Sequence, residues 1–190
     1  MPNWCSTTYK CAGEPKDINA LYSMLKYIDK RKTTVLKNGF GKWWLGNLVH
    51  LLGFDWEKYY CRGEITDYDI DGNVITIWQE TAWGEQEGVR EAIETAYPSI
   101  KVYYIAEEPG CGVFCTNDSN REYFSERYFL DSYEDTDYFG TIEEVADKVS
   151  EIVGYEVKPC LNEAQDALDR YVEEHEDEDL FYSLNEFEVA

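Results

Sequence analysis

Three aspartates, Asp67, Asp69 and Asp71, alternate with apolar or aromatic residues, and carboxylates at this spacing could bind a divalent cation. They occupy the first, third and fifth positions of an EF-hand calcium loop, and the glycine required at the sixth position follows. The twelfth position, which needs a bidentate glutamate, is Trp78. The same alternation is typical of a β-strand with one wet face that leads into a turn. The pattern therefore favours a β-hairpin, with a cation site at the three aspartates as the alternative.

Six cysteines and two histidines could supply a nucleophile or zinc ligands. No Cys-x-x-Cys occurs, and neither His50 nor His175 lies near a cysteine in sequence, so the spacing does not favour zinc. Cys111 follows a Pro-Gly turn and could be a nucleophile, but no histidine lies near it in sequence to activate the thiol. We therefore predict no cofactor and assign no catalytic residue. An enzyme that uses a cation at the aspartates, or Cys111, is the alternative function.

Aromatic and acidic side chains are the candidates for binding a partner. Two adjacent tryptophans follow Lys42 and could stack on a partner's ring, or could simply anchor a short helix. An acidic run near the C-terminus could bind a basic surface, or could be a solvated helical face and tail. The candidate partner-binding residues are Trp43, Trp44, Glu173, Glu174, Glu176, Asp177, Glu178 and Asp179.

The charge is strongly negative and unevenly distributed. The chain has 39 acidic and 17 basic residues, a formal net charge of -22. Residues 131–190 contain 20 acids and 3 bases, whereas residues 1–130 contain 19 acids and 14 bases and are only mildly acidic. Such a surface repels nucleic acid and anionic membranes, and it favours a protein partner with a basic surface. A carboxylate-rich helix, at about 1.5 Å per residue, can approach the charge density of DNA. Alternatively, the acidic tail could fold over the basic stretch 26–42 of the same chain.

Several features of the sequence also predict the cellular compartment. The N-terminus has no basic start followed by an apolar run, so we expect no secretory signal. The longest apolar stretch, 43–52, is too short to span a bilayer. A chain of 190 residues with 44% hydrophobic content can bury a core without disulfides, so reduced cysteines are expected. These features predict a cytoplasmic protein.

The elements that would position these residues follow from periodicity and turn signals. Apolar residues at helical spacing predict a helix over 17–28, a short buried helix over 43–52 and a helix over 85–97. The alternation described above predicts a hairpin of 60–70 with 74–81. Further strands are expected at 3–12, 101–106, 112–116 and 127–132. The order strand, helix, two strands, helix, strand is the ferredoxin-like split βαβ pattern, with an antiparallel sheet and helices on one face.

The last third is predicted to be a helical acidic extension. Helices are expected over 142–153, with Thr141 as its cap and Glu144 completing a capping box, and over 162–174. The predicted fold is therefore α+β: a ferredoxin-like domain over residues 1–135 with extra hairpin strands, and an acidic helical extension over 136–190.

The opening segment 1–5, Met-Pro-Asn-Trp-Cys, resembles that of the Api92-like/YubB family of phage and plasmid proteins. Segments that look like other motifs of the family follow in order at 41–43, 81–83, 97–98 and 104–114. The resemblance covers roughly residues 1–117 and implies a ferredoxin-like core, a mobile-element origin and no assigned catalytic residue. Taken together, we expect a non-enzymatic protein-binding module with an acidic surface. Its specific form would be a DNA mimic acting against a host DNA-binding or defence protein.

Overall fold

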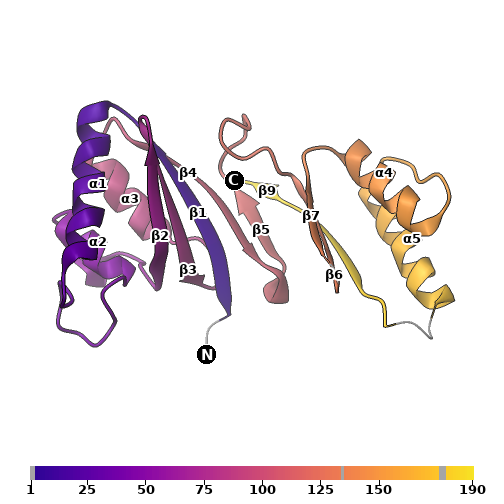
Figure 1. Ribbon diagram of the computed structural model, residues 1–190, viewed down its shortest axis with the longest axis horizontal. Coiled ribbons are helices and arrows are strands. Elements are labelled where there is room, and N and C mark those ends of the chain that lie inside the picture. The colour runs from indigo at the N-terminus through magenta and orange to yellow at the C-terminus, as the bar shows by residue number, and fades with distance from the viewer. Residues whose placement is uncertain (1–2, 134, 176–178) are drawn as a thin grey trace. The chain divides into compact units, whose positions relative to one another are not determined.

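The computed structural model describes residues 3–133, 135–175 and 179–190, and the chain forms two compact units (Figure 1). Unit 1 is Met1–Asp118 and unit 2 is Ser119–Ala190. The boundary expected from the sequence lay later, after residue 135. It lies earlier in the structure because the strand at 128–132 pairs only with strands of unit 2 among its described hydrogen-bonded neighbours.

Unit 1 is built on an antiparallel sheet. Its five strands lie in the order β2-β3-β1-β4-β5, and each neighbouring pair is antiparallel. The predicted hairpin is confirmed, with Gly72 (φ 56°) in its two-residue turn. An irregularity between Ile65 and Asp67 shifts the side-chain alternation of the first hairpin strand. The strands are β1 (Trp4–Ala12), β2 (Gly63–Asp71), β3 (Val74–Ala82), β4 (Lys101–Glu108) and β5 (Val113–Thr116).

Three helices lie on one side of this sheet: α1 (Pro15–Lys30), α2 (Leu45–Leu51) and α3 (Glu87–Ala96) (Figure 1). Two short 3-10 helices, η1 (Trp56–Lys58) and η2 (Pro109–Cys111), interrupt the connecting segments. Alternate residues of β1 face the helices and are buried. The predicted inward face of the first helix is confirmed, because its four apolar residues are all buried. These are Ile18, Leu21, Leu25 and Ile28.

Unit 2 is not only helical, and that part of the expectation is corrected. It contains an antiparallel sheet with the order β7-β6-β8, covered by two helices. The strand expected at 127–132 is present as β6, but the other short strands of this unit were not predicted, because they lack a clear apolar alternation. The capping box of Thr141 and Glu144 is confirmed. The elements are β6 (Tyr128–Ser132), β7 (Thr136–Phe139), α4 (Ile142–Val153), α5 (Leu161–Glu174), β8 (Tyr182–Glu186) and β9 (Glu188–Val189).

Two further observations bear on the sequence-based expectations. All six cysteines lie in the described residues and are free thiols, and Cys5, Cys11 and Cys61 are buried. Of the helices in the described ranges, none is both long and apolar enough to cross a membrane. The helices and sheets described above make the chain an α+β protein, with a separate hydrophobic core in each unit.

Candidate functional site

The three aspartates of the hairpin do not converge. Asp67, Asp69 and Asp71 follow one another along the exposed face of β2. Alternate residues of a strand are about 7 Å apart, so one small cation cannot reach all three carboxylates. Among the described residues, no group of three or more His, Cys, Asp or Glu side chains is placed to hold a metal ion. The three aspartates are therefore not grouped around one point on this hairpin, and we base no proposal on them.

Cys111 lies at the end of η2, where its thiol accepts a hydrogen bond from the Asn3 amide at 2.9 Å. A hydrogen bond with the Glu108 carboxylate raises the pKa of Cys111 above that of an ordinary cysteine. The same contact lowers the pKa of Glu108. A raised pKa reduces the fraction of thiolate, which is the reactive form. The environment of Cys111 therefore opposes its use as a nucleophile.

Unit 1 contains a pocket of about 610 Å³. Its volume falls within the range of ligand sites, about 300–1,000 Å³. The walls come from the start of β1, the segment before α2, the segment around η1 and the start of β2. Six aromatic side chains line it: Trp4, Phe40, Trp44, Trp56, Tyr59 and Tyr60. Aromatic rings dominate ligand sites and interface hot spots, so this pocket is the candidate binding site.

Trp44 forms the centre of this aromatic group. Its ring centroid lies 4.8 Å from that of Phe40 and 5.0 Å from that of Trp56, and the two tryptophan rings are nearly perpendicular. Gly46 makes room for the ring, because a Cβ at that position would lie only 2.2 Å from it. Trp44 is 9% exposed, whereas Trp4 and Phe40 are each 54% exposed. The pocket therefore has a fixed aromatic base and open aromatic sides.

The adjacent tryptophans of the sequence point to different places. The backbone of this segment continues the sheet, because Trp44 pairs with Glu64 and the Trp43 carbonyl accepts from the Ile65 amide at 2.9 Å. Neighbouring residues of an extended chain face opposite sides. The Trp43 ring packs 5.8 Å from the Tyr68 ring and does not line the pocket. Of these two tryptophans, only Trp44 lines the candidate site.

Three charged residues line the pocket, Glu57, Arg62 and Glu64. All three are exposed. The ion pairs found among the described residues include neither Glu57 nor Glu64. The pocket therefore combines an aromatic interior with two carboxylates and one guanidinium.

Gln86, a fully buried residue before α3, holds the back of the pocket in place. Its side-chain carbonyl accepts a hydrogen bond from the backbone amide of Arg62. Its amide group donates to the carbonyls of Ala82 (3.3 Å) and Gly84 (3.0 Å). The Ala82 amide in turn donates to the Arg62 carbonyl at 2.9 Å. Gln86 thereby fixes two pocket-lining segments to each other.

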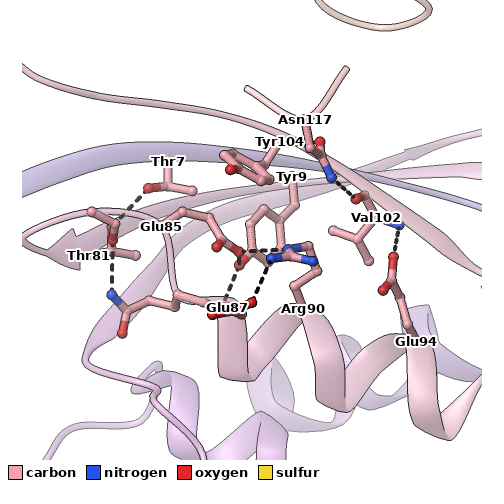
Figure 2. Close-up of polar contacts among 12 residues, drawn as sticks. Thr7, Tyr9, Thr81, Glu85, Glu87, Arg90, Glu94, Val102, Tyr104 and Asn117 are labelled. Atoms are coloured by element: carbon pink, nitrogen blue, oxygen red, sulfur yellow. Dashed lines mark hydrogen bonds and ion pairs between the residues drawn. The ribbon is translucent and has the colours of Figure 1, made fainter. Parts of the chain in front are cut away.

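A buried polar network next to Gln86 joins α3 to the sheet, as Figure 2 shows. The fully buried Tyr9 hydroxyl contacts the Glu85 carboxylate and donates to the Gln86 carbonyl at 2.9 Å. Arg90 donates to Glu85 at 3.2 Å, and its guanidinium lies 5.6 Å from the centre of the Tyr104 ring. Burial raises the pKa of Glu85, although the hydrogen bonds from Tyr9 and Arg90 oppose the shift. Burial also raises the pKa of Tyr9 and of Tyr104.

The remaining hydrogen bonds of the network link α3 to β4, and they link Asn117, in the loop after β5, to β4 as well. The Val102 amide donates to the Glu94 carboxylate, and the Val102 carbonyl accepts from Asn117, both at 2.9 Å (Figure 2). The Asn117 side chain also accepts from the Tyr104 amide at 2.7 Å. These groups bond to one another and to backbone, so we assign them a structural role rather than a chemical one.

Unit 2 presents an acidic surface on its two helices. Nine carboxylates of α4 and α5 are exposed, against two cations in the same helices, Lys148 and Arg170. Lys148 is already paired with Asp137 at 2.8 Å. Of the predicted partner-binding residues, Glu173 and Glu174 end α5 and Asp179 is exposed; Glu176, Asp177 and Glu178 lie outside the described residues. The nine are Glu143, Glu144, Asp147, Glu151, Glu163, Asp166, Asp169, Glu173 and Glu174.

Sequence reasoning missed most of the pocket. Of its six aromatic residues only Trp44 was a candidate, because the others are separated along the chain and lie in loops or at strand ends. The available signals were the high aromatic content of 16% and the glycine two residues after Trp44. Neither signal shows which rings meet in space.

No protein-family model matches this chain, and no curated protein matches it. A crystal structure of an unknown protein from Galdieria sulphuraria is similar at 13% sequence identity and a TM-score of 0.27, over 96% of this chain and 98% of that one. A likeness at that TM-score carries no argument about fold or function. Function must therefore be inferred from the residues of this chain.

Proposed function

We propose that this chain is a non-enzymatic binding protein whose acidic second unit binds a basic surface of a protein partner. The observation that carries the proposal is the concentration of charge in unit 2. This unit has 22 acidic and 5 basic residues, a net charge of -17, whereas unit 1 has a net charge of -5. Like charges gathered on one small unit destabilise it through repulsion, and a basic partner would relieve that repulsion.

The charge density of the helices can be compared with that of DNA. The helices α4 and α5 present nine exposed carboxylates and contain two cations, which leaves seven net negative charges. The longer helix, α5, has 14 residues and is about 21 Å long. Because α4 packs against α5, the seven charges are spread over about the length of α5. The pair therefore carries one net charge per about 3 Å, against one per about 1.7 Å of duplex axis. The helices thus reach roughly half the density of DNA, which supports mimicry of a DNA surface as the specific form of the proposal.

The wider assignments are part of the same proposal. We propose that unit 1 is a ferredoxin-like domain, supported by the antiparallel order β2-β3-β1-β4 and by helices between β1 and β2 and between β3 and β4. The similarity of residues 1–5 to the Api92-like/YubB family supports an origin in a phage or plasmid. Free cysteines are usual in the cytoplasm, where we place the binding event.

The experiment that tests the function captures host DNA-binding proteins on the immobilised full-length chain and elutes them with salt. The test variant carries Asp166→Asn, Asp169→Asn and Glu173→Gln, three exposed positions of α5. The matched control carries Asp67→Asn, Asp69→Asn and Asp71→Asn, three exposed positions of β2. Both variants lose three negative charges, so a difference between them reports the position of the charge.

We expect the α5 variant to release captured proteins at lower salt than the wild type, and the β2 variant to behave as the wild type does. Duplex DNA should compete for the same captured proteins. If both variants release the captured proteins at equally lowered salt concentrations, net charge alone drives the capture. If no captured protein is displaced by duplex DNA, the DNA-mimic form of the proposal fails.

A further inference from the structure

The proposed binding of a basic partner uses the carboxylates of α4 and α5 in unit 2. It leaves the aromatic pocket of unit 1 without a role. The pocket has an aromatic base at Trp44, open aromatic sides at Trp4 and Phe40, and two carboxylates, Glu57 and Glu64, that pair with no cation among the described residues. Its back wall is fixed by the buried Gln86. A preformed pocket of this kind indicates a ligand of definite chemistry.

The lining favours a cation. The faces of aromatic rings are electronegative, so they attract a cation placed over them. Two of the three charged lining residues are carboxylates, and unit 1 as a whole is acidic. A phosphate or other anion would be repelled by both features. A neutral apolar ligand would cover Glu57 and Glu64 without pairing them, which opposes its binding.

Among organic cations, a guanidinium fits the set of groups best. Its plane stacks on aromatic rings, and its five N–H donors can hydrogen-bond to carboxylates at the same time. A lysine ammonium is a compact, strongly hydrated charge that stacks less well. A trimethylammonium group has no N–H and would leave the carboxylates without donors. The cavity of about 610 Å³ is larger than one arginine side chain, which favours an arginine carried on a polypeptide over a free small cation.

We propose that the aromatic pocket of unit 1 binds an arginine side chain of the protein partner, stacked among Trp4, Phe40 and Trp44 and paired with Glu57 or Glu64. This inference rests on the proposed function, because it takes the partner to be a basic protein. Arginine and tryptophan are both enriched at the energetic centres of interfaces. The pocket would therefore supply specificity, while the acidic helices of unit 2 supply attraction at longer range.

The test titrates the full-length ¹⁵N-labelled chain with the capped tripeptide acetyl-Gly-Arg-Gly-amide and follows the indole N–H signals of its tryptophans by NMR. The same tripeptide with citrulline replaces the guanidinium by a neutral group of nearly the same shape. We expect saturable shifts with the arginine peptide, at least tenfold weaker binding with citrulline and at least threefold weaker binding with lysine. Equal affinity for arginine and citrulline, no shift with arginine, or tighter binding of a trimethyllysine peptide would overturn the proposal.

Variants locate the site. Phe40→Ala removes a ring that is 54% exposed in the pocket, and we expect it to weaken the arginine peptide at least threefold. Trp78→Ala removes a ring that is 39% exposed on β3 outside the pocket, and it should leave binding unchanged. Glu57→Gln combined with Glu64→Gln should weaken binding, and Arg62→Gln should strengthen it. Equal effects of the Phe40 and Trp78 substitutions, or weaker binding in Arg62→Gln, would contradict the assigned site.

The proposal for the pocket and the proposal for the acidic helices can be disproved independently. If the arginine peptide does not bind while the α5 variant still loses its DNA-binding partners, only the pocket assignment is wrong. If the arginine peptide binds as expected while α5 and β2 variants capture partners equally, the pocket stands and the proposed role of unit 2 is wrong.

Discussion

Glu85 is a carboxylate that folding places in an environment unfavourable to its charge. Burial raises its pKa above the value of about 4.3 expected in the unfolded chain, so the folded state binds more protons over the pH window that starts there. Stability therefore falls as pH rises through that window. We predict that Glu85→Gln removes this loss, so that the variant gains unfolding free energy relative to the wild type as the pH rises above about 4. Urea unfolding of the variant and the wild type at several pH values measures this difference in unfolding free energy.

The control for this prediction is Glu87→Gln, because Glu87 also lies near Arg90, at 3.7 Å, but its side chain is 69% exposed. If Glu85→Gln and Glu87→Gln give the same pH profile, burial of Glu85 is not the source of the effect.

Gln79 is a second residue at odds with its surroundings. It is 2% exposed, and neither polar atom of its side chain has a hydrogen-bond partner in the described structure. A buried amide without partners costs about 1–3 kcal/mol. We predict that Gln79→Met raises the unfolding free energy by about 1–2 kcal/mol in urea titrations. A loss of stability would instead show that the amide has a partner such as a buried water.

The contrasting substitution is Thr81→Val. The Thr81 hydroxyl is bonded to Thr7 at 2.8 Å and to the Cys5 carbonyl at 3.1 Å. Removing a satisfied hydroxyl should destabilise the chain by about 1 kcal/mol. Opposite signs at these two positions of β3 are the expected result.

The packing of α3 depends on a glycine. A Cβ at Gly88 would lie 2.4 Å from the Tyr60 nitrogen and 2.6 Å from its carbonyl oxygen, so the helix must approach this pocket-lining segment without a side chain. Alanine normally favours a helix over glycine by about 1 kcal/mol. We predict that Gly88→Ala nevertheless destabilises the chain by about 1–3 kcal/mol and weakens binding in the pocket, because overpacking against backbone is costly.

Gly84→Ala is the matched control for Gly88→Ala, because a Cβ at Gly84 would meet no atom within 4 Å. Thermal unfolding and tryptophan fluorescence of both variants check the prediction. A stabilised Gly88→Ala chain with unchanged fluorescence would show that the helix can move away from Tyr60 at no cost.

At the scale of the whole molecule, the two units should respond differently to salt. Along the axis of α5, Asp166 and Asp169 are about 4.5 Å apart, and Asp169 and Glu173 are about 6 Å apart. Raising NaCl from about 0.1 M to about 1 M shortens the screening length from about 10 Å to about 3 Å, which suppresses repulsion at that range. We predict that amide hydrogen exchange in α4 and α5 slows with salt, and that exchange in α1 and α3 changes less. Equal slowing in both units would contradict a charge effect confined to unit 2.

Local patterns predicted most of the unit 1 elements and some of unit 2. The helical spacing of Ile18, Leu21, Leu25 and Ile28 and the capping box at Thr141 both proved correct, because each depends on residues within one or two turns. The strands β7 and β8 were not predicted. Each is four or five residues long and partly exposed. β8 pairs with β6, which lies far from it in the sequence, whereas β7 directly follows β6 but is too short to show a clear alternation.

The sequence by itself determined the charge of this protein, the location of that charge in the last third, and the periodicities that produce an α+β chain. Only the tertiary structure decided which side chains form a site. It separated Trp43 from Trp44, spread Asp67, Asp69 and Asp71 along one strand, and gathered rings from three separate segments into a pocket. Charge and periodicity are local properties that can be counted along a chain. A pocket depends on contacts between distant residues, and these are fixed by strand pairing and helix packing, not by spacing in the sequence.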